Sequence, residues 1–179
     1  MIGPSDDNLP MTFKQLEQSN AVLQIVGRGI AAGAAGGLAE IAWVTLYAAA
    51  TGTDPAILTR GVTTAVGLSA LFPDSTVAWG VTVHLGFAVT LGVALSFVWR
   101  ALSSHRSDEA GPYPFMIAAL AGVWTLNFFV VLPIISPAFI HLLPYPISLV
   151  SKMLFGLAAA ETFRLMNVSV LNTRPVRGF

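Results

Sequence analysis

The chain has 179 residues, of which 55% are hydrophobic and only 10% are charged, with nine basic and nine acidic side chains. Soluble domains carry about a quarter charged residues, so this composition is typical of a membrane protein and argues against a soluble enzyme. The zero net charge gives no reason to expect a nucleic-acid partner, and the absence of cysteine excludes disulfides, thiolate metal sites and thiol catalysis.

The first 28 residues precede any stretch that is long enough to cross a membrane. They contain Asp6, Asp7 and Glu17 and lack the basic start and apolar core of a cleavable secretory signal. Over residues 12–28, apolar side chains recur at roughly helical spacing between polar ones. This pattern predicts an amphipathic helix at the membrane surface, with a solvated tail as the alternative. We expect residues 1–28 to be cytoplasmic.

A helix needs about twenty predominantly apolar residues to cross a bilayer core about 30 Å thick. Four stretches of the sequence meet this requirement: residues 29–50, 77–98, 113–135 and 145–166. Aromatic residues that would anchor the helices at headgroup level lie at their edges: Trp79, Trp99, Tyr113 and Tyr145. The sequence therefore predicts an all-α integral membrane protein, with a four-helix transmembrane bundle over residues 29–166 and a cytoplasmic tail over residues 167–179.

Residues 54–72 form the one ambiguous segment. Asp54 and Pro55 are typical of a helix start, and the apolar run that follows could be a fifth span. However, Arg60, Thr63 and nearby polar residues form one stripe along this helix, opposite an apolar face. We therefore expect a short amphipathic helix over about residues 55–72 in the first outer loop.

The placement of basic residues favours four spans with both termini in the cytoplasm. In that topology seven basic residues lie inside: Lys14, Arg28, Arg100, Arg106, Arg164, Arg174 and Arg177. Only Arg60 lies in an outer loop, whereas a fifth span would move Arg100 and Arg106 outside. Because cytoplasmic loops of membrane proteins are enriched in Lys and Arg, the sequence predicts a multi-pass protein of the bacterial inner membrane.

Small residues recur at intervals of four along the expected spans. Such stripes let two helices approach closely, because lipid-exposed helices associate through packing more than through the hydrophobic effect. The glycines that we expect at helix contacts are Gly29, Gly33, Gly37, Gly80, Gly92 and Gly156.

Ionisable residues lie on these small-residue stripes, which are the faces expected to meet other helices. They are Glu40, His84 and Lys152, and Asn127 lies at a similar depth in the third span. A charge near the bilayer centre costs about 2.5–3.5 kcal/mol on insertion scales unless it is paired or hydrated. We therefore predict that Glu40 pairs with Lys152 and that His84 and Asn127 complete a buried polar network. The network would either fix the register of the helices or serve as a proton relay or ligand site.

No resident cofactor is expected from the sequence. Haem between helices needs two axial ligands, and only His84 lies within a span, since His105 and His141 lie in loops. Glu40, His84 and His141 are suitable ligands for copper or zinc but lack a diagnostic spacing. Phosphate-binding loops, nucleophile elbows and HExxH motifs are also absent from the sequence, so we do not expect an enzyme.

Two further segments have expected positions but open roles. The proline-rich apolar loop over residues 133–146 should lie at the outer interface, either covering the polar network or docking a partner. Glu161 and Arg164 should form an interfacial ion pair near the inner end of the fourth span.

The sequence supports two functional hypotheses. The first is a non-catalytic accessory subunit of a larger inner-membrane complex, such as a respiratory assembly, in which the chain packs against other membrane subunits. The second is a small oligomeric conduit or carrier for protons, ions or a small molecule that uses the polar network. The lipid bilayer is the partner that both hypotheses share.

Overall fold

The computed structural model describes residues 11–65, 67–68, 77–103 and 111–172. In this part of the chain the protein is entirely helical, as expected. Three of the helices described are long and apolar enough to cross a membrane: Gln18–Thr51, Val77–Ser103 and Tyr113–Ile135. They contain the first three of the spans expected from the sequence.

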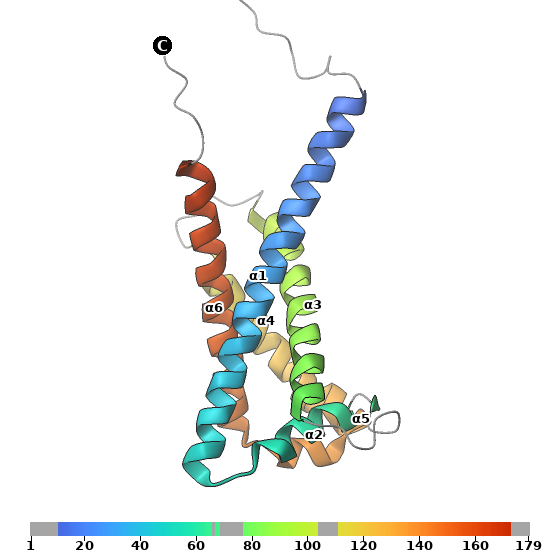
Figure 1. Cartoon of the computed structure of the whole chain (residues 1–179), viewed down its shortest axis with the longest axis vertical. Coiled ribbons are helices and arrows are strands. Elements are labelled where there is room, and N and C mark those ends of the chain that lie inside the picture. Colours follow the sequence, from blue (N-terminus) through green and yellow to red (C-terminus); the bar gives the residue numbers. More distant parts are fainter. Residues whose placement is uncertain (1–10, 66, 69–76, 104–110, 173–179) are drawn as a thin grey trace, which may run out of the picture.

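The first helix, α1 (Met11–Thr51), runs for 41 residues without a break. At 1.5 Å per residue it is about 60 Å long, roughly twice the thickness of a bilayer core. The surface helix expected over residues 12–28 is therefore not a separate element but the start of the same helix. No proline interrupts this stretch of sequence, and its glycines do not break the helix. The N-terminal part of α1 extends beyond the other helices (Figure 1).

A glycine turn ends α1 and leads into α2 (Pro55–Ala65). Gly52 has a φ of +70°, and the N–H of Thr53 donates to the carbonyl of Ala48 at 3.0 Å, as in a Schellman C-cap. Asp54 Oδ1 then accepts a hydrogen bond of 2.9 Å from the N–H of Ala56 at the start of α2.

Helix α2 covers the first part of the segment expected over about residues 55–72, but it ends earlier and buries a different face. It ends at Ala65, and most of the remaining expected residues lie outside those described. Thr63, which was expected on the exposed polar face, is buried together with Leu58. The hydroxyl of Thr63 donates to the carbonyl of Arg60 at 2.9 Å, so it can be buried without losing its hydrogen bond.

The third expected span is not a regular α-helix throughout. It consists of α4 (Tyr113–Leu126), a π-helical turn η3 (Asn127–Val131) and α5 (Leu132–Ile135). The N–H of Leu132 bonds to the carbonyl of Asn127, five residues earlier. Pro133 follows at once, and its ring has no N–H and would clash with the carbonyl four residues before it in an α-helix. The wider π turn relieves this clash and is a recognised cause of irregular helix geometry.

The chain continues through a 3₁₀ helix, η4 (Pro137–His141), into the last helix, α6 (Tyr145–Asn172). This helix has 28 residues and contains the fourth expected span. It carries Lys152, Glu161 and Arg164, and it is not among the three described helices that are apolar enough by composition to cross a membrane.

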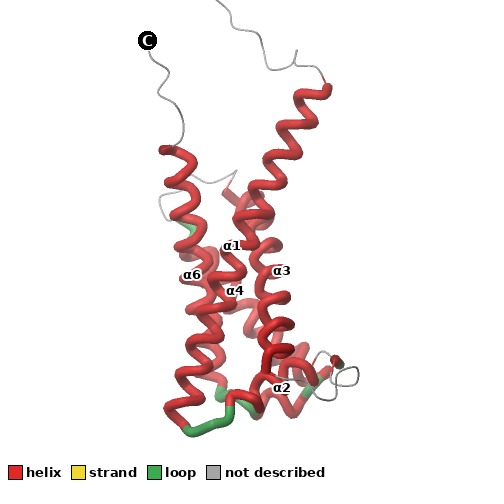
Figure 2. The backbone as a smooth tube through the Cα atoms, viewed as in Figure 1, coloured by secondary structure: helices red, strands yellow, loops and turns green. Residues whose placement is uncertain are grey.

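The long helices run antiparallel in sequence order. The start of α1 and the end of α6 lie at one end of the bundle, which we call the terminal end, and α2 and η4 lie at the other, the loop end (Figures 1 and 2). Helix α1 packs most extensively, against both α3 (Val77–Ser103) and α6, and α6 also packs against α4. Helices α3 and α4 make few contacts with each other. The bundle is therefore an open arc in the order α3, α1, α6, α4.

Glycines permit the closest approach in the bundle, between α1 and α3. A Cβ atom on Gly29 would lie 2.5 Å from Cα of Val93, and one on Gly92 would lie 2.5 Å from Cα of Gly33. Gly37 faces the side chain of Ala88 in the same seam. The hydroxyl of Ser96 adds a hydrogen bond of 3.0 Å to the carbonyl of Ile25 across it.

The other expected packing glycines also lie against neighbouring elements. Gly80 on α3 faces Thr59 of α2, and Gly156 on α6 faces the backbone of Met116 on α4. A core of buried apolar side chains fills the space between the helices: Ala32, Ala88, Leu95, Met116, Leu120, Phe155, Ala159, Ala160 and Phe163.

Candidate functional site

A buried carboxylate lies where three helices meet. Glu40 of α1 is only 3% exposed, and Nζ of Lys152 on α6 lies 2.6 Å from its Oε1 atom. Ser151, the neighbour of Lys152, contributes a hydroxyl that donates to the same oxygen at 3.4 Å. The structure thus places Glu40 and Lys152 in a direct ion pair, with one oxygen of the carboxylate fully engaged.

The second oxygen of Glu40 faces the histidine of α3. Nε2 of His84 lies 3.3 Å from Oε2 of Glu40, but the geometry is not that of a hydrogen bond. Both atoms are buried and have no hydrogen-bond partner among the described residues. Each of these two atoms could therefore still form a hydrogen bond.

Glycines of α1 bring these three helices close enough for the cluster to form. Gly37 approaches α3 at Ala88, one turn from His84, and Gly36 approaches the ring of Phe155 on α6. Glu40 follows one turn later on the same face of α1. The ring of Phe155 in turn lies 5.9 Å from Nζ of Lys152, which is within the range of a cation–π contact.

The ion pair is nearly neutral as a unit, and this makes its burial tolerable. Removing two charges from water is expensive, and the attraction within the pair offsets that cost only when the geometry is good. Lys152 and Glu40 meet this condition through their 2.6 Å contact.

A cavity of about 580 Å³ extends from the cluster toward the loop end. Glu40, His84 and Lys152 lie in its wall, and most of the remaining wall is apolar. Elements from the whole chain contribute to this wall, including the following apolar side chains: Val44, Leu58, Val62, Val81, Leu91, Val123, Phe128, Leu132, Phe139 and Leu143. The cavity is thus a half-open, mainly apolar chamber with charged groups on one side.

The loop segments whose role the sequence left open contribute to this cavity. Leu58 of α2 and Phe139 of η4 line it at the loop end. Gly61 of α2 lies against the side chains of Phe139 and Leu142, which joins α2 to η4. The sequence left two roles open for the proline-rich loop, covering the polar network or docking a partner. This packing favours the first.

The π turn places Asn127, the fourth expected member of the network, in the cavity wall. Asn127 and Phe128 both line the cavity. Asn127 therefore shares the chamber with Glu40, His84 and Lys152. A single π turn inside a helix is frequent at functional sites, because it reorients the side chains around it.

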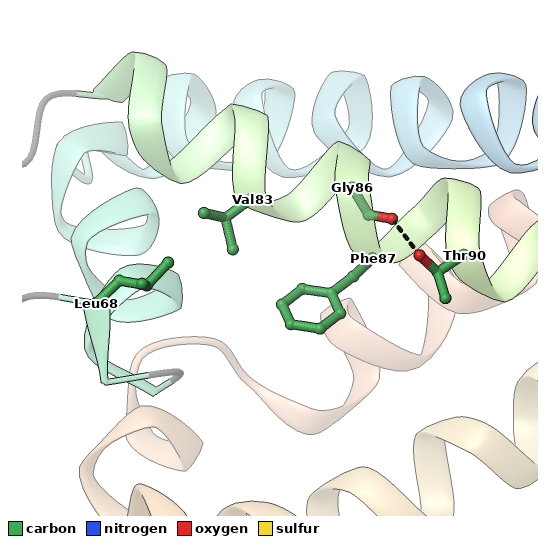
Figure 3. Close-up of a pocket in the computed structure, with 5 residues that line it drawn as sticks. All are labelled: Leu68, Val83, Gly86, Phe87 and Thr90. Carbon is green, nitrogen blue, oxygen red and sulfur yellow. Dashed lines mark hydrogen bonds between the residues drawn. The ribbon is translucent and has the colours of Figure 1, made fainter.

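A shallow hollow lies on the outside of α3, next to the cavity. Its lining residues are Leu68, Val83, Gly86, Phe87 and Thr90 (Figure 3), and its volume is about 470 Å³. Phe87 lines both this hollow and the inner cavity, and 58% of its surface is exposed. Its ring therefore lies at the boundary between the chamber and the outer surface of α3.

Tryptophan side chains hold the first turn of α6 in place. Nε1 of Trp43 on α1 donates to the carbonyl of Ile147 at 3.0 Å. Nε1 of Trp124 on α4 donates to the hydroxyl of Ser148, also at 3.0 Å. Since Lys152 follows one turn later, these bonds position the helix that supplies the ammonium group.

A second polar cluster lies nearer the terminal end of the bundle. Glu161 and Arg164 form the ion pair expected from the sequence, with Nε of Arg164 at 2.9 Å from Oε2 of Glu161. The hydroxyl of Tyr113 also donates to Glu161, which the sequence did not indicate. This cluster links α4 to α6 and is distant from the cavity wall, so we assign it a structural role.

Glu40, His84 and His141 are the residues that the sequence makes suitable as copper or zinc ligands. Within residues 11–65, 67–68, 77–103 and 111–172, no three His, Asp or Glu side chains are grouped so that they could hold a metal ion. His141 lies exposed on η4, and His105 lies outside the described residues.

No family model matches the chain, and neither does any curated protein or solved structure. The geometry of the cluster and the cavity is therefore the basis for a functional proposal. Three features of this site had no signal in the sequence: the hydroxyl of Ser151, the boundary position of Phe87 and the cavity itself. Each depends on how helices that are distant in sequence pack together.

Proposed function

We propose that the protein binds a lipophilic small molecule inside the membrane, with the polar end of the molecule directed at Glu40, His84 and Lys152. The observation that carries this proposal is the cavity of about 580 Å³ whose mainly apolar wall includes a buried charged cluster. Small-molecule sites are typically concave, about 300–1,000 Å³ in volume and mostly apolar, with a few placed polar groups. Binding, rather than catalysis, is the activity that these features support.

Of the two functions expected from the sequence, this proposal belongs with the carrier. The accessory-subunit hypothesis rests on the small size of the chain and on its lack of catalytic motifs, and it does not require a cavity. A polar network that only fixed helix register would not require a cavity beside it either. The apolar wall also argues against a path for hydrated ions, which would need polar groups along its length.

We propose that the chain crosses the bacterial inner membrane four times, with both termini in the cytoplasm. Helix α6 is about 42 Å long and lies antiparallel to α4 against the same bundle. Its charged side chains within the proposed span are paired, Lys152 with Glu40 and Glu161 with Arg164. The seven-to-one distribution of basic residues supports this orientation.

Reporter fusions test this topology. Alkaline phosphatase, which is active only outside the cytoplasm, should be inactive when fused after His105 or after Arg174 and active when fused after Ser136. Both His105 and Arg174 would lie on the cytoplasmic side, whereas Ser136 would lie in the second outer loop. Phosphatase activity of either cytoplasmic fusion at the level of the Ser136 fusion would contradict the topology.

Filling the cavity tests the proposed function. Val81 lines the cavity, whereas Val83, two residues further along α3, lines only the outer hollow. Dodecan-1-ol should raise the unfolding temperature of the wild-type protein and of Val83→Phe, because a ligand that binds only the folded state stabilises it. At ten times its Kd the gain is about 1.4 kcal/mol, or roughly 3–6 °C. In Val81→Phe the added ring occupies the chamber, so the shift should be largely lost.

The matched valines distinguish binding in the cavity from general effects of the alcohol on detergent or lipid. An equal shift in Val81→Phe and Val83→Phe, or none in the wild-type protein, would count against a ligand-binding cavity. Each variant must first show a cooperative unfolding transition without ligand, so that a missing shift reflects lost binding.

A further inference from the structure

From the leftover bonding capacity at the cluster we infer the class of ligand: a lipophilic alcohol, whose uncharged hydroxyl group donates to Oε2 of Glu40 and accepts from Nε2 of His84. This inference rests on the proposed function and narrows it.

The two oxygens of Glu40 have different surroundings. Oε1 is engaged by the ammonium of Lys152 at 2.6 Å and by the hydroxyl of Ser151 at 3.4 Å. Oε2 has no hydrogen-bond partner among the described residues, and its side chain is only 3% exposed. Glu40 lines the cavity, but Oε2 and Nε2 of His84 are themselves covered, so a ligand hydroxyl reaches them when a neighbouring side chain moves aside. A buried carboxylate oxygen without a partner costs roughly 1–3 kcal/mol or more, so a donor supplied by a ligand would be strongly favoured there.

His84 supplies the complementary group. Its Nε2 atom is also buried without a hydrogen bond within the described structure, and it lies 3.3 Å from Oε2 of Glu40. When the ring proton is on Nε2, this atom is a donor next to an acceptor. A hydroxyl group is a donor and an acceptor on one oxygen atom, so a single hydroxyl can satisfy both atoms. An ether or an alkane can satisfy at most one of them.

The charge balance of the cluster selects against a charged head group. The carboxylate of Glu40 and the ammonium of Lys152 already neutralise each other at 2.6 Å. A cationic head at Oε2 would lie close to Lys152, and an anionic head would lie against the carboxylate itself. Repulsion between like charges is weakly screened away from water, so both arrangements are unfavourable. A neutral hydroxyl adds two hydrogen bonds without adding charge.

The apolar wall determines the rest of the ligand. Leu58, Val62 and Phe139 line the cavity on the side of the loop helices, and Phe128 and Leu132 line it from the third span. These side chains offer no further anchor for a second polar group. Apart from the charged cluster, the polar side chains of the wall are few: Thr45, Thr59, Asn127, Ser148 and Ser151. The ligand is therefore a mainly apolar chain or ring system with its hydroxyl group at the cluster.

Four probes with the same twelve-carbon chain test this inference on the purified protein: dodecan-1-ol, dodecyl methyl ether, dodecylamine and dodecanoate. Shifts in unfolding temperature over a range of concentrations give a Kd for each probe. We expect the alcohol to bind about tenfold more tightly than the ether, because a hydrogen bond to a charged group contributes about this factor. The amine and the carboxylate should bind more weakly than the alcohol.

Two variants show whether the preference arises at the cluster. In Glu40→Leu/Lys152→Met, an apolar pair replaces the ion pair, a change that buried pairs often tolerate. His84→Leu removes only the imidazole and leaves the ion pair in place. In Glu40→Leu/Lys152→Met the alcohol and the ether should bind with similar affinity, because the carboxylate to which only the alcohol can donate is gone. In His84→Leu both probes should bind more weakly than to the wild-type protein, because both lose the same donor, but the preference for the alcohol should remain. Val83→Phe should keep both the affinity and the tenfold preference.

The outcomes separate this inference from the proposed function. If neither the alcohol nor the ether stabilises the wild-type protein, the cavity does not bind lipophiles and the proposed function itself fails. If both bind equally, if the preference for the alcohol survives in Glu40→Leu/Lys152→Met, or if His84→Leu weakens the binding of neither probe, the cavity binds lipophiles but the hydroxyl assignment is wrong. Tighter binding of the amine or the carboxylate than of the alcohol would overturn the assignment in favour of a charged ligand.

Discussion

Replacing Lys152 with methionine should destabilise the folded protein by about 3–5 kcal/mol, because it leaves the carboxylate of Glu40 buried without its partner. The 2.6 Å contact and the 3% exposure of Glu40 place this pair among buried ion pairs, for which removal of one partner is most costly. Unfolding in increasing concentrations of sodium dodecyl sulfate, followed by tryptophan fluorescence, gives the free-energy difference.

Removing Glu40 together with Lys152 gives the decisive comparison with Lys152→Met alone. Glu40→Leu combined with Lys152→Met should recover most of the lost stability, since no charge then remains buried alone. Arg164→Met is the matched control on the same helix, because it breaks an ion pair whose side chains are largely exposed. Its effect should be much smaller. If Lys152→Met and Arg164→Met have the same effect, or if the double variant is no better than Lys152→Met, the cluster does not hold the helices as described.

Gly92→Ala should destabilise the protein by about 1–3 kcal/mol, the usual cost of forcing an extra methyl group into a close contact. The new Cβ would lie 2.5 Å from both Cα and N of Gly33, and these backbone atoms can move only if the helices separate. The same detergent titration measures the loss.

Gly86→Ala is the matched control for the glycine seam. Gly86 lies on the same helix, but a Cβ atom there would meet nothing within 4 Å. The change should therefore be neutral or slightly stabilising, since alanine is the better helix former. Separation of α1 from α3 at Gly92 should also weaken the binding of dodecan-1-ol, because one hydroxyl can no longer reach both Glu40 and His84. Similar stability of the Gly92→Ala and Gly86→Ala proteins would contradict the close packing of α1 on α3.

The sequence was most informative where a residue can be accommodated inside a membrane in only a few ways. Isolated charges at one depth in a membrane are costly, and this alone suggested that Glu40 and Lys152 meet. The spacing of Gly29, Gly33 and Gly37 indicated which face of α1 carries the close contact. Both arguments start from the residues of each span by itself, so neither needs knowledge of how the helices pack.

The sequence was less informative about where one helix continues into the next segment and about features formed by several helices together. Apolar spacing over residues 12–28 is the same whether the helix lies on the membrane or continues into a span, and the structure has one helix, α1. Thr63 was assigned to the polar face of α2 because of its residue type, but its hydroxyl is satisfied locally and can be buried. Pro133 was visible in the sequence, yet it was interpreted as the start of a loop rather than as the cause of a π turn.

The cavity could not have been derived from any pattern along the chain. Its wall draws residues from every helix described, and its existence depends on α3 and α4 making few contacts. Helical periodicity identifies faces that pack, but it does not indicate which pair of faces remains apart.

The position of Phe87 has a consequence for how the proposed ligand would be supplied. Its ring forms part of both the chamber and the hollow on the outer surface of α3 (Figure 3), and in the proposed topology that surface faces lipid. A molecule dissolved in the bilayer would meet the chamber there without first entering water. Occupancy would then follow the mole fraction of the ligand among the lipids rather than its aqueous concentration. A compound that partitions strongly into membranes is concentrated in the lipid. The site would therefore fill at aqueous concentrations far below the dissociation constant for the ligand in the lipid phase.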